Sequence, residues 1–124
     1  MLSVAVYLVI VFFVGMGLLA LASPESITGP FGMPTLTPAG RNEVRAVYGG
    51  FGLAVAAMLV LALYTPALRA GVLLAVAAAL AGMAAGRVVA ALVERPPAFY
   101  PSWFYCGVET AMAAVLWLEA SRPL

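Results

Sequence analysis

The sequence predicts an all-α integral membrane protein, a four-helix bundle in one domain that covers residues 1–124. Composition is the first reason, because 65% of the residues are hydrophobic, only 9% are charged and the mean hydropathy is +1.11. The second reason is a set of four apolar runs, each near the ~20 residues that a helix needs to cross a hydrocarbon core ~30 Å thick. The third is that no run carries the polar face of a helix from a soluble protein. The expected helices cover about residues 2–22, 38–64, 69–94 and 102–119.

The first apolar run, 2–22, has an alternative interpretation as a secretory signal, because Ala20-Leu21-Ala22 before Ser23 resembles a cleavage site. No Lys or Arg precedes the run, however, and it is longer than the ~7–15 apolar residues of a signal sequence. We therefore expect this segment to be the first membrane-spanning helix.

Residues 23–37 form the one substantial loop that the sequence predicts, between the first and second helices. Proline and glycine are so frequent in this segment that we expect a compact, turn-rich cap without regular structure. At its end, Thr37 suits the N-cap and Pro38 suits the first helical position. The second helix should therefore begin near Pro38.

Short turns separate the remaining helices. Tyr64-Thr65-Pro66 ends the second helix, Arg69 opens the third, and Glu94-Arg95-Pro96-Pro97 ends the third. Such short connections make consecutive helices antiparallel neighbours. The fourth helix begins with an aromatic cluster of the kind found at membrane–water interfaces: Phe99, Tyr100, Trp103, Phe104 and Tyr105.

Two ionisable side chains lie inside apolar runs, Arg87 in the third and Glu109 in the fourth. An ionised group at mid-helix in a bilayer costs roughly 2.5–3.5 kcal/mol on insertion scales, so such residues mark a site by default. Alternating helix direction places both on the same side of the membrane as Arg45, each about 10–12 Å in from its helix end at 1.5 Å per residue. We expect the charges of the opposite side to lie at solvated helix ends: Arg69, Glu119 and Arg122.

These positions predict a half-buried polar chamber that binds a ligand. Arginine suits this role because its planar guanidinium binds a carboxylate or phosphate through two parallel hydrogen bonds and stays charged when buried. Two interpretations remain beside it: a purely structural ion pair between Arg87 and Glu109, and a contact face for a protein partner. The expected ligand-binding residues are Asn42, Glu43, Arg45, Tyr48, Arg87, Tyr105 and Glu109, and the expected helix-packing residues are Gly49, Gly52, Gly82 and Gly86.

Missing residue types exclude several kinds of chemistry. The chain has no His, no Asp and no Lys, and its only cysteine is Cys106. A metal or haem site, an internal disulfide and a Cys-x-x-Cys redox pair therefore lack their ligands or partners, and we expect no cofactor and no catalytic residue. No basic tract is present for a nucleic acid. The Gly49-Gly50-x-Gly52 segment lacks the further glycine and the preceding strand of a nucleotide-binding loop, which favours helix packing.

Three functions are compatible with this pattern. The first is a protein that binds a lipid-like or amphipathic small molecule at the Arg/Glu cluster. The second is an accessory or self-assembling subunit, present as a homo-oligomer or in a larger membrane complex. The third is a proton-coupled transporter with Glu109 as the proton carrier. Arginines balance across the membrane, but Glu25, Glu43 and Glu94 make one side less basic. We therefore expect both termini in the cytoplasm.

One longer segment resembles a known pattern. The segment Arg41-Asn42-Glu43-Val44-Arg45-Ala46-Val47-Tyr48-Gly49-Gly50, followed by Gly86-Arg87, then Glu94 with a nearby proline, and finally Glu109, resembles a family of small four-helix bacterial inner-membrane proteins. That family is catalogued as a domain of unknown function. The resemblance implies a four-span fold of the bacterial inner membrane that shares these charged positions, and it brings no assigned activity. Small multidrug exporters have a similar size but depend on an acid in the first helix, and residues 2–22 contain none.

Overall fold

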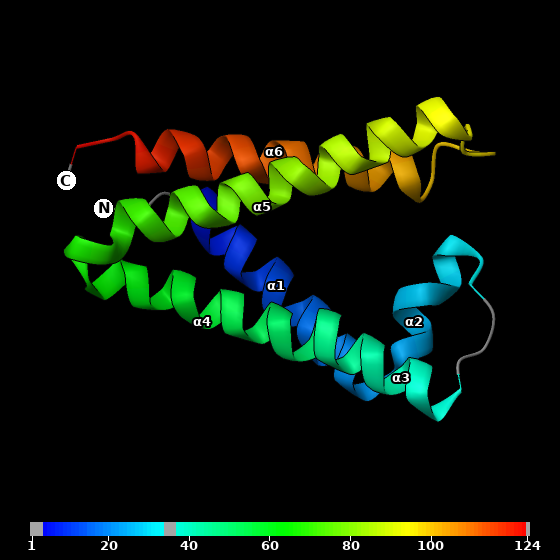
Figure 1. Ribbon diagram of the computed structural model, residues 1–124. Coiled ribbons are helices and arrows are strands. Elements are labelled where there is room, and N and C mark those ends of the chain that lie inside the picture. The colour runs from blue at the N-terminus through cyan, green and yellow to red at the C-terminus, as the bar shows by residue number, and fades with distance from the viewer. Residues whose placement is uncertain (1–3, 34–36, 124) are drawn as a thin grey trace. The chain divides into compact units, whose positions relative to one another are not determined.

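The computed structural model describes residues 4–33 and 37–123, and within these ranges all regular structure is helical. The first residues of the expected 2–22 helix and Pro34 of the expected loop lie outside the described ranges. Figure 1 shows the elements in chain order. They are α1 (Val4–Ala22), α2 (Pro24–Thr28), a 3-10 turn (Gly29–Phe31), α3 (Pro38–Val44), a π-helical segment (Arg45–Gly50), α4 (Phe51–Tyr64), α5 (Pro66–Val93) and α6 (Ser102–Ala120).

Three helical stretches of the described chain are long and apolar enough to cross a membrane: Val4–Ala22, Pro38–Tyr64 and Pro66–Val93. The prediction of an all-helical chain with several such helices is confirmed, and it is compatible with a multi-pass membrane protein. Helix α6, the fourth expected span, is not among the three. It is long enough, at 19 residues, but Glu109 and Glu119 lower its hydropathy.

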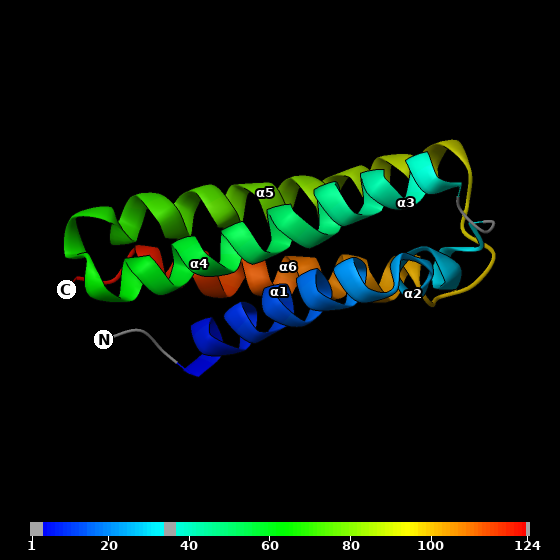
Figure 2. The same cartoon turned by 90° about the horizontal axis from the view of Figure 1, so that it is seen from below.

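The stretch Pro38–Tyr64 is one continuous helix made of α3, the π-helical segment and α4 (Figure 2). Its start follows the sequence-based expectation, because the Thr37 hydroxyl accepts a hydrogen bond from the Gly40 amide at 3.1 Å and Pro38 occupies the first turn. The six residues Arg45–Gly50 have π-helical hydrogen bonding. Such segments are rare in proteins, and many of those that occur lie at functional sites. Nothing in the hydrophobic pattern predicts this wider turn.

Two sequence-based expectations about boundaries are wrong. The segment 23–37 contains the short helix α2, because Pro24 at a first-turn position has the backbone angle that a helix needs. A left-handed Gly32, with φ 73°, ends the following 3-10 turn. Helix α5 begins at Pro66 and not at Arg69, because proline also suits the first turn here and Thr65 takes the flanking N-cap position.

The chain divides into two compact units, one of residues 7–61 and one of residues 1–6 with 62–124. In unit 7–61, α1 packs against the π-helical segment and α4 at three glycines, and the contacts pair rising residue numbers in α1 with falling ones in α4. A Cβ added to Gly17 would lie 3.0 Å from the Gly49 carbonyl oxygen. A Cβ added to Gly52 would lie 3.4 Å from the Phe13 carbonyl oxygen. Glycine therefore permits a close approach of the two backbones.

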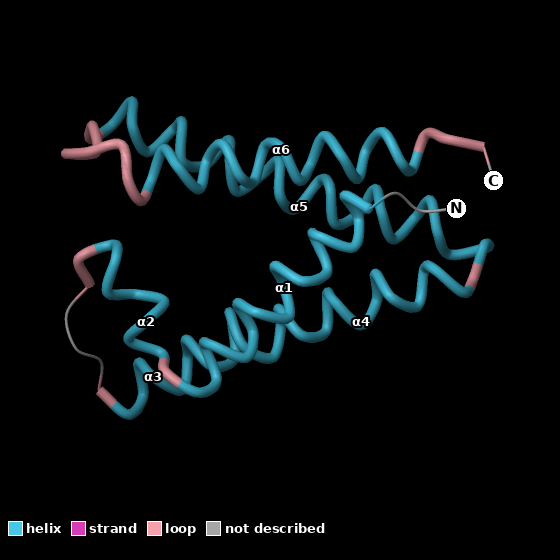
Figure 3. Tube along the Cα trace, turned by 180° about the vertical axis from the view of Figure 1, so that it is seen from behind, coloured by secondary structure: helices cyan, strands magenta, loops and turns pink. Residues whose placement is uncertain are grey.

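In the other unit, α5 and α6 form a helical hairpin, and Figures 1 and 3 show the two helices side by side. The contacts pair rising residue numbers in α5 with falling numbers in α6, so the two helices are antiparallel. Their buried apolar residues recur at spacings of three and four, which places them on one face of each helix. This face, which we call the seam, consists of Leu73, Ala77, Leu80 and Ala84 of α5 with Met112, Ala113 and Leu116 of α6.

Candidate functional site

Arg87 of α5 and Glu109 of α6 form a bidentate ion pair at one end of the seam. The guanidinium Nε donates to Oε1 at 2.8 Å and Nη2 donates to Oε2 at 3.0 Å. This is the strong, geometrically specific form of the arginine–carboxylate interaction. The pair is asymmetric in its exposure, since 22% of the Arg87 side chain is exposed against 4% of the Glu109 side chain.

Seam register brings these two side chains together. Arg87 follows the buried Ala84 by three residues, and Glu109 precedes the buried Met112 by three, so each continues the seam of its own helix. Side chains lean toward the N-terminus of their helix. In an antiparallel hairpin the two therefore lean toward each other along the seam.

Two further side chains of α6 surround the pair. The Arg87 guanidinium carbon lies 5.9 Å from the centroid of the Tyr105 ring, within the range of a cation–π contact. The Cys106 thiol donates a weak hydrogen bond to the Ala84 carbonyl oxygen at 3.6 Å. The Tyr105 ring also packs edge-on against Phe104, in the aromatic cluster that the sequence predicts at the start of this helix.

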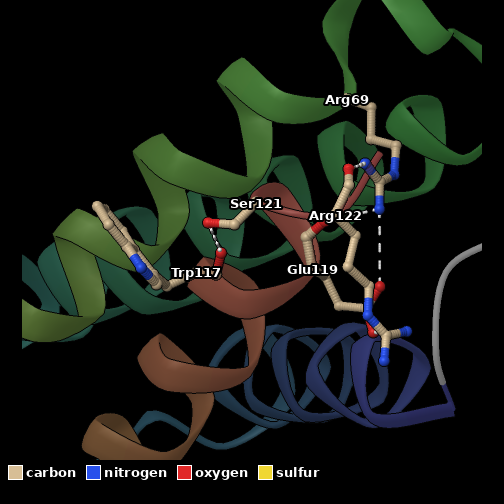
Figure 4. Close-up of polar contacts among 5 residues, drawn as sticks. All are labelled: Arg69, Trp117, Glu119, Ser121 and Arg122. Carbon is tan, nitrogen blue, oxygen red and sulfur yellow. Dashed lines mark hydrogen bonds and ion pairs between the residues drawn. The ribbon is translucent and has the colours of Figure 1, made fainter. Parts of the chain in front are cut away.

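A second buried ion pair lies at the opposite end of the seam (Figure 4). Arg69 Nη2 is 3.6 Å from Glu119 Oε2, and only 7% and 5% of these two side chains are exposed. Glu119 Oε1 also accepts a 3.3 Å hydrogen bond from Arg122 Nη1. The expectation that Arg69 and Glu119 lie at solvated helix ends is therefore wrong. Arg69 precedes the buried Leu73 by four residues, so the seam spacing itself contained the signal.

Arg69 also caps the C-terminus of α6. Its Nη2 donates to the Glu119 carbonyl oxygen at 2.7 Å and its Nη1 donates to the Arg122 carbonyl oxygen at 3.4 Å. The last carbonyl groups of a helix lack intrahelical partners, and a cation there also complements the helix dipole. Among the described residues, two buried atoms of this cluster have no hydrogen-bond partner, Arg69 Nε and Glu119 Oε2.

Arg45, another expected ligand residue, caps a helix in unit 7–61. Its Nε donates to the Leu21 carbonyl oxygen at 3.0 Å, which satisfies one of the last carbonyls of α1. Tyr48 is half-buried in the same π-helical segment, while Asn42 and Glu43 are exposed in α3. The local sequence does not reveal this capping role, because the role depends on a contact between residues 24 positions apart.

The expected site residues thus fall into two groups. Asn42, Glu43, Arg45 and Tyr48 belong to unit 7–61, and Arg87, Tyr105 and Glu109 belong to the α5–α6 hairpin. The structure brings the second group together, and a common site for both groups stays a prediction. No three His, Cys, Asp or Glu side chains in the described part of the chain are placed to hold a metal ion.

The four expected packing glycines also divide. Gly49 and Gly52 contact α1 closely, since a Cβ at Gly49 would lie 2.8 Å from Leu21 Cδ2 and one at Gly52 would lie 3.1 Å from Met16 Cε. Gly82 and Gly86 make no such contact in the α5–α6 hairpin, because a Cβ at either would meet no described atom within 4 Å. Packing of those two against another helix stays a prediction.

An all-helical chain with three membrane-length helices and a hairpin joined by buried ion pairs defines a class of small, helical, membrane-compatible proteins. Within that class, the chain belongs to the family DUF4345, a domain of unknown function, whose family model matches residues 1–119. The match confirms membership in an uncharacterised family and includes all four residues of the two seam pairs. No curated protein and no solved structure matches the chain significantly.

Proposed function

We propose that the protein is a multi-pass protein of the bacterial inner membrane and that it binds a lipid-like or amphipathic small molecule at the Arg87–Glu109 pair. In this proposal α1, the helix 38–64, α5 and α6 all span the membrane as an antiparallel four-helix bundle with both termini in the cytoplasm. The three membrane-length helices support the location. The paired carboxylates support a fourth span, because neutralised charges are tolerated in a bilayer far better than single ones.

The observation that carries the binding proposal is the asymmetric exposure of the ion pair. A molecule that approaches from outside the hairpin meets the guanidinium first, since 22% of the Arg87 side chain is exposed and only 4% of the Glu109 side chain. The carboxylate holds the guanidinium in one orientation, which lowers the entropy lost when a head group binds. Phosphate, carboxylate and carbonyl oxygens are the acceptors that suit an arginine.

The surroundings of Arg87 suit the rest of an amphipathic molecule. The Tyr105 ring lies beside the guanidinium, and ring faces accept apolar groups next to a polar head. On α5, Met83 and Val88 have 46% and 44% of their surface exposed, so an acyl chain has apolar side chains to contact on the same helix.

Co-purification of a small molecule tests this function. The protein is purified in mild detergent and its bound lipids are measured by native mass spectrometry. We expect Arg87→Gln to reduce the affinity for the bound molecule roughly 10-fold or more, because a hydrogen bond to a charged group is worth about 1.5–3 kcal/mol. The control is Arg95→Gln, since Arg95 is an exposed arginine after the end of α5 and should keep full occupancy.

Removal of Arg87 alone leaves Glu109 without its cation and risks misfolding. The variant with both Arg87→Gln and Glu109→Gln avoids this, because two amides can still hydrogen-bond across the seam. We expect this neutral variant to fold, as judged by its helical circular dichroism, and to lose the bound molecule. Full occupancy in the folded neutral variant contradicts the assignment of Arg87.

A second function, an accessory or self-assembling subunit, is favoured by one observation on α5. Gly82 and Gly86 are exposed one turn apart, and an added Cβ would have open space at both. Small residues at this spacing permit close packing between membrane helices. Cross-linking in native membranes should then yield a discrete oligomer that Gly82→Leu abolishes, whereas a monomer in both proteins argues against this function.

Proton-coupled transport, the third function considered, gains no support from the geometry. Both carboxylate oxygens of Glu109 accept hydrogen bonds from Arg87. Uptake of a proton by Glu109 removes its negative charge and leaves the guanidinium without its counter-charge.

A further inference from the structure

Helix α6 poses a problem for membrane insertion that its neighbour α5 does not. Among the described helices that exceed 18 residues, α6 alone falls outside those that are apolar enough to cross a membrane. Its charges are Glu109 and Glu119, and those of α5 are Arg69 and Arg87. Every one of these four charges is paired across the seam. We infer that α6 enters the membrane only as a hairpin with α5, whose two arginines neutralise its two carboxylates.

The spacing of the charges along each helix explains why α5 can enter the membrane alone and α6 cannot. Arg69 and Arg87 are 18 positions apart in α5, which is about 27 Å at 1.5 Å per residue. That distance is close to the ~30 Å thickness of the hydrocarbon core, so both arginines of an inserted α5 lie near an interface. Long arginine side chains reach the head groups from such positions. Helix α5 can therefore span the membrane without a partner.

The carboxylates of α6 do not have this option. Glu109 and Glu119 are 10 positions apart, about 15 Å along the helix axis. Since this is half the core thickness, they cannot both reach opposite interfaces when α6 spans the membrane. At least one carboxylate then lies deep in the core, where an unpaired charge opposes insertion.

The hairpin geometry supplies the missing neutralisation at both positions. Arg87 holds both oxygens of Glu109. At the other end, Arg69 pairs with the Glu119 carboxylate and also donates to two backbone carbonyls at the end of α6. Backbone carbonyls without a hydrogen-bond partner are also unfavourable in lipid. One arginine therefore neutralises the charge of the side chain and also donates to the helix terminus.

This inference rests on the proposed membrane location but not on the proposed ligand. The test uses the full chain with Cys106→Ser and one new cysteine, at Thr65 before α5, at Ala98 between α5 and α6, or at Pro123 after α6. Each cysteine is labelled in intact cells with a maleimide that does not cross membranes, and total labelling is measured after lysis. We expect Pro123→Cys to react from the same side as Thr65→Cys and from the opposite side to Ala98→Cys.

Charge variants then test neutralisation. Glu109→Arg places a second cation beside Arg87. We expect the number of chains in which α6 spans the membrane, relative to those in which it does not, to fall on the order of 100-fold. The label at position 123 then appears on the side of position 98. Exchanging the two residues, Arg87→Glu with Glu109→Arg, should return position 123 to its original side. The exchange would not do so if position 109 simply tolerated no substitution.

Four results overturn the inference. The first two are a parent chain in which position 123 is labelled from the same side as position 98, and a Glu109→Arg variant in which the side of position 123 does not change. The other two are an exchanged pair that does not return position 123 to its original side, and a chain that is lost from carbonate-washed membranes in every variant. Only the last also removes the proposed membrane location, so the two failures are distinguishable. Retained ligand in Arg87→Gln, in contrast, affects the binding proposal alone.

Discussion

Replacing Gly17 by alanine tests the close packing of α1 against the π-helical segment and α4. The added Cβ would lie 2.8 Å from Leu53 Cγ and 3.0 Å from the Gly49 carbonyl oxygen. The leucine side chain can rotate away, but the carbonyl belongs to the helix backbone and cannot move alone. The two helices must therefore separate by a few tenths of an ångström, and overpacking of this kind typically costs about 1–3 kcal/mol.

Gly15→Ala is the matched control, because it makes the same change two residues earlier in the same helix. A Cβ at Gly15 would meet nothing within 4 Å, so only the helix propensity changes, in favour of alanine by about 0.5–1 kcal/mol. The gain in helix propensity applies to both variants and cancels, so they should differ by the overpacking cost, roughly 1–3 kcal/mol in the free energy of unfolding.

The assay is thermal unfolding of parent, Gly15→Ala and Gly17→Ala in the same detergent, followed by circular dichroism. A change of 1 kcal/mol shifts the midpoint by roughly 2–8 °C for chains of this general size. Gly17→Ala should melt several degrees below the parent, and Gly15→Ala at or slightly above it. A Gly17→Ala midpoint equal to that of Gly15→Ala refutes the packing argument.

Three other predictions concern helix ends. Arg69→Ala should destabilise the hairpin by about 3–5 kcal/mol in chemical denaturation, because it removes the buried partner of Glu119 and leaves only the largely exposed Arg122 beside that carboxylate. Arg122→Ala should change stability by less than about 1 kcal/mol, because the Arg122 side chain is 64% exposed, and equal effects of the two variants contradict the capping role of Arg69. Thr37→Ala should cost about 1 kcal/mol through loss of the N-cap, while Thr37→Ser should restore it in the same assay. Arg45→Met should speed amide hydrogen exchange at the end of α1 and leave exchange in α6 unchanged; unaltered exchange at Ser23 disproves the cap on α1.

Local features of the sequence predict most of the fold. Apolar runs of membrane length predict the long helices, since both length and hydropathy are read within one segment. Thr37 and Pro38 predict a helix start because the capping bond spans only three residues. The many prolines and glycines of residues 23–37 indicate turns and therefore do not predict helix α2, although a proline at the first turn, here Pro24, favours a helix.

The candidate site shows where local inference ends. The expectation of exposed side chains at Arg69 and Glu119 equated a helix end with solvent. Both instead continue the α5–α6 seam. Their burial follows from the register of the two helices, which brings together residues 50 positions apart in the sequence. Arg45 illustrates the same limit, because its partner is the end of another helix. The π-helical turn has no periodic signature, so the pattern of apolar residues could not reveal it.

Coupling between Arg87 and Glu109 tests the central claim, the pairing of a buried carboxylate of α6 with an arginine of α5, most directly. The unfolding free energies of the parent, Arg87→Gln, Glu109→Gln and the double variant form a complete cycle. Each single variant should lose several kcal/mol, while the double variant loses less than the sum, with a coupling of at least about 1 kcal/mol. Additive losses, within ~0.5 kcal/mol, contradict the account.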